Sequence, residues 1–386
     1  MTTVFPSPVA VDGSSRDDVV LRVGADPGSV RWGTLPARGD EPLATVASGA
    51  VVVFDTLSHE GILEDQGRDP IAFFGAQGVA PDDVLDDAIR VASVGDHPAG
   101  SGPHVVSRPI AVEGARAGDW LRVDVLRLTP RVPYGVISNR HGKGVLADEL
   151  PRGGTTVSVF ARATERDGQL YGVIDRTGPD AVAAYRAATK GSHLGVVTDP
   201  RGASDALMFL LHPFLGIMGV TPNTDEHLNT VPPGDFGGNL DINLLTEGTS
   251  LYLPVQVDGA GFTVGDPHFV QGNGEVSLTA LEASLTAELR LTVVPHDRFV
   301  ADFGELSGPL VETPRYWVPT GRSHDLDVAL RRCVREAISL LETRAGMDEA
   351  HAYAYLSAAV DFDISEAVDV NLGVHACIPK DDLTRR

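Results

Sequence analysis

Basic residues are scarce in this sequence. The chain has 386 residues, of which 31 are lysine or arginine and 53 are aspartate or glutamate, so the formal net charge at pH 7 is −22. A surface that binds nucleic acid needs clustered lysine and arginine, which this sequence does not show. The composition therefore predicts that nucleic acid is not a partner.

Cysteine and long apolar runs are also scarce. The two cysteines, Cys333 and Cys377, cannot form a framework of disulfides. Residues 1–6 lack the basic and apolar regions of a signal peptide. No apolar run approaches the roughly 20 residues that cross a bilayer. These features predict a soluble, cytoplasmic protein without a membrane partner.

Glycine, proline and β-branched residues are plentiful, and they indicate the fold class. The 42 glycines and 26 prolines are spread along the whole chain. Short β-branched runs predict strands, while helical periodicity is clear in only a few places. The strand runs are 19–23, 49–54, 121–126 and 155–160, and the helical segments are 81–91, 325–343 and 348–360. We therefore expect a mainly β protein with a smaller α+β part.

The length of the chain suggests two or three packed subdomains rather than one simple core. We place an N-terminal β subdomain at residues 1–140, a central β subdomain at 141–301 and a C-terminal α+β portion at 302–386. Cys333 falls within the apolar stripe of the helix predicted over 325–343, so we interpret it as a core residue rather than a reactive thiol.

The stretch Val264–Glu282 is rich in both glycine and titratable groups. It carries Asp266, His268, Gln271 and Glu275 on a backbone that its glycines allow to bend sharply. Because an apolar run precedes it and an alternating segment follows, we expect a loop between strands, where catalytic groups are often carried. A glycine-rich hairpin with solvated polar residues is an equally good interpretation of composition alone.

A second polar segment, residues 51–69, follows a hydrophobic strand. Asp55 ends the strand, and His59 and Glu60 come directly before a glycine. Imidazole and carboxylate are the ligands that borderline divalent metals such as zinc accept, and a carboxylate beside a metal can act as a base. The spacing is not H-E-x-x-H, and His59 taken alone is equally compatible with a capping or core role.

Two further segments carry polar groups at turns. Residues 139–144 contain His141; in isolation a basic turn is the favoured interpretation, and a loop that presents His141 to a substrate oxygen is the alternative. Residues 230–241 contain a glycine pair followed by Asn239 and Asp241, which would face the same side of an extended chain. This amide and carboxylate form a candidate ligand site.

Four motifs, taken together, resemble the acetamidase/formamidase family. They are H-P-F-L-G-I-M-G-V, P-P-G-D-F-G-G-N-L-D, L-Y-L-P-V and G-D-P-H-F-V-Q-G-N-G-E, and the segment D-T-L-S-H-E-G-I-L-E-D-Q-G-R-D-P is similar to the acetamidases of actinobacteria. The resemblance extends from about Val51 to Lys380. Relative to the family's commoner G-D-G-H-x-x-Q-G-D-G-E, this chain has Pro267 in place of a glycine and Asn273 in place of an aspartate.

The resemblance implies a hydrolase of short aliphatic amides that forms a carboxylate and ammonia. It also implies a β-rich, cytoplasmic protein that assembles as a homo-oligomer, either a dimer or a higher assembly of dimers. The alternatives are a formamidase, a hydrolase of a larger amide, or a non-catalytic β protein that binds a metal or a small ligand.

The sequence narrows the mechanism by elimination. Cys333 lies in a helix stripe and Cys377 has only His375 near it in sequence, so a thiolate nucleophile is not supported. There is neither a G-x-S-x-G elbow nor a serine-amidase signature. Water activated by a metal or a carboxylate remains, and a divalent metal can both polarise an amide carbonyl and produce hydroxide near neutral pH.

We therefore expect a metal-dependent amidohydrolase with zinc as the expected ion. Glu275 is the expected base that deprotonates water and then protonates the departing ammonia, with Glu60 as the second choice. Gln271, His141 and Asn239 are the expected substrate contacts. The metal ligands are drawn from Asp55, His59, Asp241 and His268.

Overall fold

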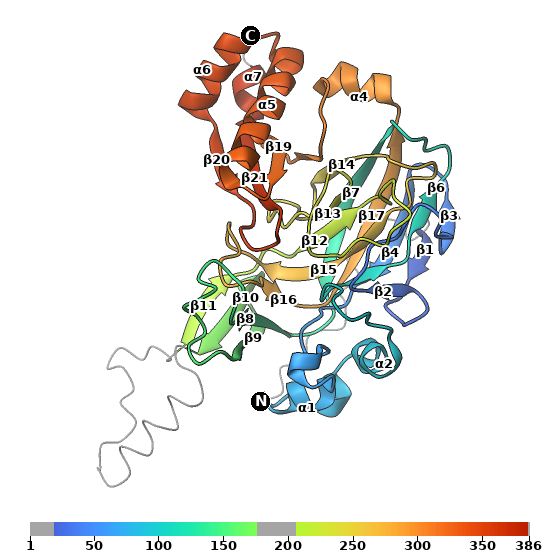
Figure 1. The fold of residues 1–386 in the computed structure, drawn as a ribbon, viewed down its shortest axis with the longest axis vertical. Coiled ribbons are helices and arrows are strands. Elements are labelled where there is room, and N and C mark those ends of the chain that lie inside the picture. Colours follow the sequence, from blue (N-terminus) through green and yellow to red (C-terminus); the bar gives the residue numbers. More distant parts are fainter. Residues whose placement is uncertain (1–18, 176–205, 385–386) are drawn as a thin grey trace, which may run out of the picture.

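Two large β-sheets organise the chain in the computed structural model, which describes residues 19–175 and 206–384 (Figure 1). The first residues, on which the expectation about a signal peptide rests, lie outside these ranges. The prediction of a mainly β protein with a smaller helical part is confirmed. None of the helices in the described ranges is long and apolar enough to cross a bilayer.

The first sheet has nine strands in the order β1-β4-β17-β7-β14-β18-β19-β21-β20. Their bounds are β1 Val19–Val23, β4 Ala50–Asp55, β7 Trp120–Pro130, β14 Ser250–Pro254, β17 Leu285–Val294, β18 Leu310–Glu312, β19 Tyr316–Ser323, β20 Asp361–Ile364 and β21 Leu372–Pro379. Strand β17 alternates buried and half-buried residues over Leu285–Leu291, as expected for a strand with one face on a core. Strands from all three of the ranges 1–140, 141–301 and 302–386 thus hydrogen-bond within one sheet.

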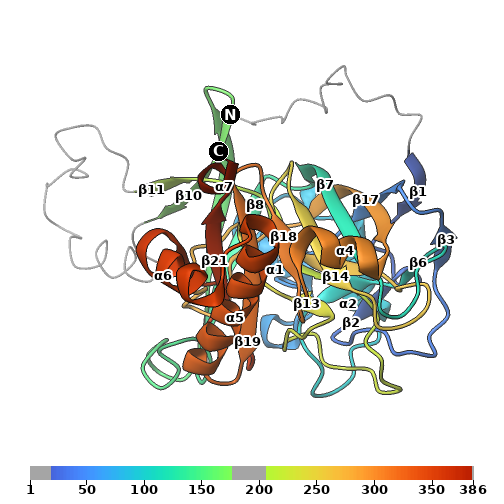
Figure 2. The same ribbon diagram turned by 90° about the horizontal axis from the view of Figure 1, so that it is seen from above.

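The second sheet carries most of the polar segments that the sequence singles out. Its main path is β11-β10-β9-β8-β16-β15-β12-β13, and β2 and β5 are attached through β15. The bounds are β2 Val30–Trp32, β5 Val105–Ser107, β8 Tyr134–Arg140, β9 Thr156–Arg166, β10 Gln169–Asp175, β11 Ala206–Leu210, β12 Phe214–Gly219, β13 Gly237–Asn239, β15 Thr263–Val270 and β16 Leu281–Glu282. Strands β3 (Ala44–Val46) and β6 (Ile110–Val112) form a separate pair. In Figure 2, β10 and β11 lie at the opposite end of the molecule from β1 and β3.

Helices cover the two ends of the molecule in Figure 1. Their bounds are α1 Pro70–Gly75, α2 Asp86–Val94, α4 His296–Phe303, α5 Leu326–Ala345, α6 Glu349–Ala359 and α7 Lys380–Thr384, with 3₁₀ turns at Glu64–Gln66 and Pro81–Asp83. The predictions of α5 and α6 are confirmed. The helix expected over 81–91 begins later, at Asp86, because a 3₁₀ turn occupies Pro81–Asp83.

Helix α5 begins after Asp325, whose side chain accepts a hydrogen bond from the backbone N–H of Val328. Its apolar face packs on β19 and β21 in a second core. Cys333 is completely buried in this core, which confirms its structural interpretation.

The stretch Val264–Glu282 is only partly a loop. Thr263–Val270 forms β15, and the connection after it ends at β16. The expectation that Asp266 and His268 lie on a loop is therefore wrong, because β15 is hydrogen-bonded to β12 on one side and to β5 and β16 on the other. Such a strand is buried on both faces, so period-2 alternation is absent from its sequence.

Candidate active site

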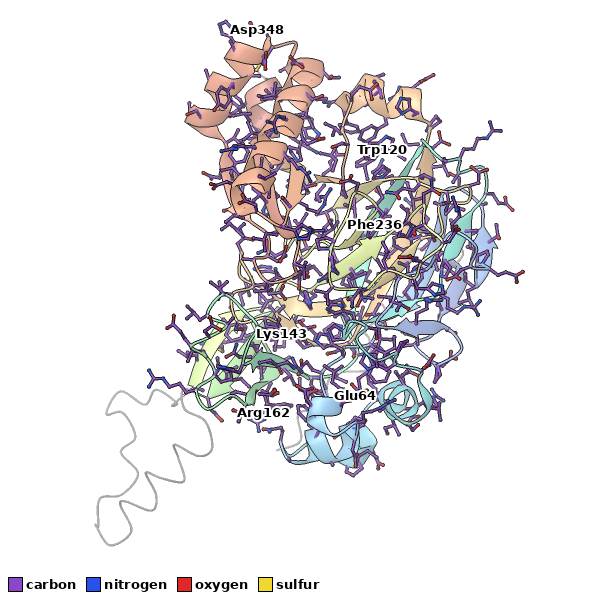
Figure 3. The ribbon with its side chains drawn as sticks, viewed as in Figure 1. Glu64, Trp120, Lys143, Arg162, Phe236 and Asp348 are labelled. Carbon is purple, nitrogen blue, oxygen red and sulfur yellow. The ribbon has the colours of Figure 1, made fainter. Side chains whose placement is uncertain are left out.

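A cavity of about 750 Å³ lies where the ends of several strands meet. Its floor is acidic and buried, and its rim includes Lys143 from the turn after β8 and Glu64 from the segment after β4 (Figure 3). The titratable groups that line its deeper part come from widely separated segments of the chain. They are His59, His104, Asp241, Asp266, Glu275, Glu282 and Asp369.

His268 lies at the centre of the acidic floor and is completely buried. Its Nε2 is 3.1 Å from Oε1 of Glu282 and 3.2 Å from Oδ2 of Asp266, and its Nδ1 is 3.8 Å from Oδ1 of Asp241. Burial disfavours the imidazolium, but Glu282 and Asp266 outweigh it and raise the pKa of His268 well above its ordinary value. The neighbouring carboxylates thus stabilise a positive charge at this position.

Two more histidines lie near Oδ1 of Asp266, the carboxylate oxygen that His268 does not contact. Nδ1 of His59 is 3.5 Å from Oδ1 of Asp266, and Nε2 of His104 is 3.9 Å from that oxygen. Burial opposes the charge on His59, yet Asp266 and Glu60 raise the pKa of His59 to about 10. Burial lowers the pKa of His104 to about 3, against the attraction of Asp266. The site therefore shifts the pKa values of two neighbouring imidazoles in opposite directions.

Three of the acidic residues have a backbone conformation that residues other than glycine rarely adopt. The φ angles of Asp241, Asp266 and Glu275 are +48°, +52° and +45°. A left-handed conformation costs roughly 1–3 kcal/mol in a non-glycine residue and persists only where the surroundings enforce it. Its repetition at three residues of one cluster indicates that the fold fixes the direction of these carboxylates.

Gly216 on β12 makes this convergence possible. Its carbonyl accepts hydrogen bonds from the N–H groups of Leu240 and Asp241, at 3.0 and 3.3 Å. A Cβ atom at Gly216 would lie 2.4 Å from Oδ1 of Asp241, 2.5 Å from Oδ2 of Asp266 and 2.7 Å from Cε1 of His268. Only a residue without a side chain leaves room for the three groups to meet.

The floor of the cavity contains many buried polar atoms without a hydrogen-bond partner. They are Nδ1 of His59, Oδ1 of Asn239, both carboxylate oxygens of Asp241, Oδ1 of Asp266, both ring nitrogens of His268, Oε1 of Gln271, Oε2 of Glu282 and Oε1 of Glu366. Most buried polar atoms in proteins are paired, so this concentration indicates a place where something binds.

Three overlapping groups of these residues have the composition of a cation site. The ligand atoms within each group lie within 4.8 Å of one another. The groups are His59–His104–Asp266, Asp241–His268–Glu275 and Asp266–His268–Glu282. Imidazole nitrogen and carboxylate oxygen are suitable ligands for zinc and similar divalent ions.

Six of the residues expected at the site are brought together. His59, Asp241, Glu275 and Asn239 line the cavity, and His268 and Gln271 lie beneath it. The side-chain amide of Asn239 donates to Oδ2 of Asp369 at 2.8 Å, which leaves its Oδ1 free. Gln271 donates to the backbone carbonyls of Asp241 and Ser365, at 3.0 and 3.1 Å, and so ties together two segments of the floor.

Three of the residues expected at the site, Asp55, His141 and Glu60, do not line the cavity. Asp55 ends β4 of the other sheet, where it accepts hydrogen bonds from Arg22 at 2.7–3.1 Å and from Thr286 at 2.6 Å. His141 is exposed at the turn after β8 and does not line the cavity.

Glu60 lies behind His59 rather than in the lining. Its carboxylate accepts hydrogen bonds from Ser138, Gln66 and Arg140. Burial acts in the opposite direction, but His59 and Arg140 lower the pKa of Glu60 to about 2. A carboxylate paired in this way is poorly suited to accept a proton, and its evident role is to hold His59 in place.

Several residues at the site carry no assignment from the sequence. In the sequence, His104 ends a glycine-rich turn at residues 100–104, and Glu282 is the last residue of the stretch Val264–Glu282, where it has no assigned role. Glu366 and Asp369 lie in the connection between β20 and β21, S-E-A-V-D-V-N, and were not singled out. In the sequence, these two acidic residues lie between small and apolar ones and precede a strand that contains His375. Nothing in this local pattern shows that the connection is buried.

Comparisons with known proteins are consistent with this site. Residues 211–383 match the model of the acetamidase/formamidase family. An acetamidase from Mycolicibacterium smegmatis is 33% identical over 45% of this chain and 49% of its own length. A formamidase from Methylophilus methylotrophus is 27% identical over 69% of this chain and 74% of its own length. These matches confirm the resemblance that the motifs indicate, although the chain spans only about half the length of the acetamidase.

The fold has a counterpart among solved structures. An acetamidase from Bacillus halodurans superposes with a TM-score of 0.65, covering 94% of this chain and 100% of the other, at 22% sequence identity. This similarity confirms the β-rich architecture expected from the resemblance.

Proposed function

We propose that this chain is an amidohydrolase of the acetamidase/formamidase family that cleaves the C–N bond of short aliphatic amides such as acetamide. The products are a carboxylate and ammonia. The observation that carries the proposal is the set of unpaired carboxylates and imidazoles on the floor of the 750 Å³ cavity. The names of the acetamidase and the formamidase that it resembles support the same reaction.

Water is the proposed nucleophile, because the lining offers no activated side chain. Neither cysteine is among the described residues that line the cavity. Ser101 does line it, but its hydroxyl donates to the backbone carbonyl of Pro98 at 2.6 Å rather than to a base. Nucleophilic catalysis requires a base within hydrogen-bond reach of the nucleophile, and this hydroxyl has none among its described contacts.

The donor set fits a divalent cation, with zinc as the proposed ion. Two groups that share His268 would supply its ligands, one with Asp241 and the other with Asp266 and Glu282; Asp55, which sequence reasoning suggested, belongs to neither. Asp241, Asp266 and His268 all present buried atoms without a hydrogen-bond partner, which supports the proposal. When bound, such a cation polarises the amide carbonyl and lowers the pKa of a water molecule.

Glu275 is the proposed base. Burial, Asp241 and Asp369 raise the pKa of Glu275 well above its ordinary value, which brings this carboxylate toward the range useful for proton transfer at neutral pH. It lines the cavity, and its backbone has the left-handed φ angle of +45°. Glu275 takes a proton from the attacking water and delivers it to the departing nitrogen.

Asn239 is the proposed contact for the substrate amide. Its side-chain nitrogen is committed to Asp369, so its oxygen remains free in the cavity to accept a hydrogen bond from the amide N–H₂. His59 lies 3.4 Å from Glu60 and 3.5 Å from Asp266, and these two carboxylates, against the effect of burial, raise the pKa of His59 to about 10, which favours a charged imidazolium beside Asp266.

A hydrolase of a larger amide is the second candidate, and the cavity volume favours it. About 750 Å³ falls within the roughly 300–1,000 Å³ of pockets that hold drug-sized ligands, which is more than acetamide fills. Relative kcat/KM on formamide, acetamide, propionamide and a cyclic amide distinguishes the candidates. A non-catalytic binding protein would release no ammonia from any of them.

The direct test replaces Glu275 by glutamine, which keeps the shape and removes the base. We expect kcat for ammonia release to fall by about 10²–10⁴-fold. Glu149→Gln, at an exposed position on the turn after β8, is the matched control and should retain wild-type activity. Wild-type ammonia release by Glu275→Gln would rule out this mechanism.

A further inference from the structure

A second group of metal-ligating side chains lies on the edge of the nine-stranded sheet, outside the cavity. Strand β20 pairs with β21 in antiparallel register, which places Asp363 opposite His375 and Asp361 opposite Cys377. The alternate residues of the two strands, including Phe362 and Ala376, pack toward α5 and α6. Because side chains alternate along a strand, the two aspartates, the histidine and the cysteine share the other face.

His375 is prepared to bind a ligand. The side chain is completely buried, and its Nδ1 is 2.8 Å from the hydroxyl oxygen of Ser365. Its Nε2 has no hydrogen-bond partner and lies 3.9 Å from Oδ2 of Asp363. An imidazole with one nitrogen fixed by a neighbour and the other unpaired is the arrangement in which proteins present histidine to a metal.

Cys377 and Asp363 complete a set of three different donors. Sγ of Cys377, Nε2 of His375 and an oxygen of Asp363 all lie within 4.8 Å of one another. Asp361 lies directly opposite Cys377 in the strand register, and Asp363 shares the same face, so two carboxylates place negative charge beside the free thiol. A divalent cation would offset this charge. Asp363 is 41% exposed, which gives an ion a path from solvent.

We propose that Asp363, His375 and Cys377 bind a divalent cation of the zinc type, at a site separate from the catalytic cavity. The thiolate–imidazole–carboxylate set selects zinc over magnesium or calcium, which prefer oxygen ligands only. With three protein ligands, water occupies the fourth position. On binding, the Cys377 thiol loses its proton to solvent and Sγ forms the bond to the ion.

This site is connected to the floor of the cavity through Ser365. Its hydroxyl contacts His375, while its backbone carbonyl accepts hydrogen bonds from Gly274 at 3.0 Å and from Gln271 at 3.1 Å. Glu366, the next residue, is completely buried, and Ala367, Val368 and Asp369 after it line the cavity. A bound ion would therefore hold in place the connection that carries Glu366 and Asp369.

Cobalt(II) tests the proposal because its spectrum reports the ligand type. The full-length protein, reduced and freed of metal, is titrated with Co²⁺ and followed in the near ultraviolet, where a thiolate-to-cobalt charge-transfer band appears only with a cysteine ligand. The wild type should show this band, Cys377→Ser should lack it, and the matched control Cys333→Ser should keep it. Absence of the band from the wild type, or its persistence in Cys377→Ser, overturns the proposal.

Two further variants keep the test valid if Cys377→Ser fails to fold. Asp363→Asn changes a partly exposed side chain and should weaken cobalt binding at the thiolate band by at least tenfold. Ser365→Ala removes the hydroxyl that orients His375 and should weaken cobalt binding by about 10–100-fold. Unchanged affinity in both variants overturns the ligand set. Because cobalt in the cavity meets no cysteine among the described residues, failure of the proposed amidase activity would leave this readout intact.

Discussion

Replacing Gly216 by alanine should abolish most of the activity while leaving a folded protein. The new Cβ atom would lie 2.4–2.7 Å from atoms of Asp241, Asp266 and His268, so at least two of these side chains must move. Overpacking a buried position costs about 1–3 kcal/mol of folding free energy. A displacement of about 1 Å at reacting groups can reduce the rate by 10²-fold, so we expect kcat/KM to fall by about 10²-fold or more.

The assay for Gly216→Ala combines ammonia release from acetamide with urea unfolding, which separates the loss of activity from the loss of stability. Gly272→Ala is the matched control, because Gly272 lies in the connection after β15 and a Cβ atom there meets nothing within 4 Å. It should behave as the wild type. If Gly216→Ala keeps wild-type kcat/KM with an intact fold, the convergence of these three groups is not required for the reaction and the proposed site is wrong.

Removal of divalent ions with a chelator should suppress ammonia release, and added zinc should restore it. Zinc at 100 times its Kd should also raise the free energy of unfolding by about 2.7 kcal/mol. Full activity in protein that elemental analysis shows to be free of metal would contradict this prediction. Asp325→Ala removes the N-cap of α5 and should cost about 1 kcal/mol in urea unfolding with unchanged activity, and a loss below about 0.3 kcal/mol would argue against the cap. Arg140→Met removes the guanidinium that lies 3.0 Å from buried Glu60 and should lower the free energy of unfolding in urea by about 3–5 kcal/mol. An unchanged stability would show that the hydrogen bonds from Ser138 and Gln66 are enough to stabilise the Glu60 carboxylate.

The individual elements of this fold were more predictable than their convergence. The strands at 19–23 and 121–126 and the helix α5 follow from local periodicity, and all are present. His59, Asp241 and His268 were also found, because histidine and carboxylate beside glycine indicate a site whatever the distant contacts are.

The errors at the site have a common physical origin. Asp55 looks like a ligand in sequence, but strand pairing places it against Arg22 and Thr286 instead. His104 looks like part of a turn, but pairing of β5 with β15 brings it to Asp266. Long-range strand register decides both outcomes, and local composition does not record it.

The unpaired polar atoms on the cavity floor lower the stability of the fold, although the proposed reaction needs them. Burying polar groups without partners opposes folding, and removing one member of a hydrogen-bonded pair carries a similar cost of roughly 1–3 kcal/mol per group. An apolar replacement of matching shape at Asp241, both of whose carboxylate oxygens are unpaired, would therefore give a chain that resists unfolding better and performs no chemistry. The acidic floor is best understood as a region that folding alone would disfavour and that its occupant completes.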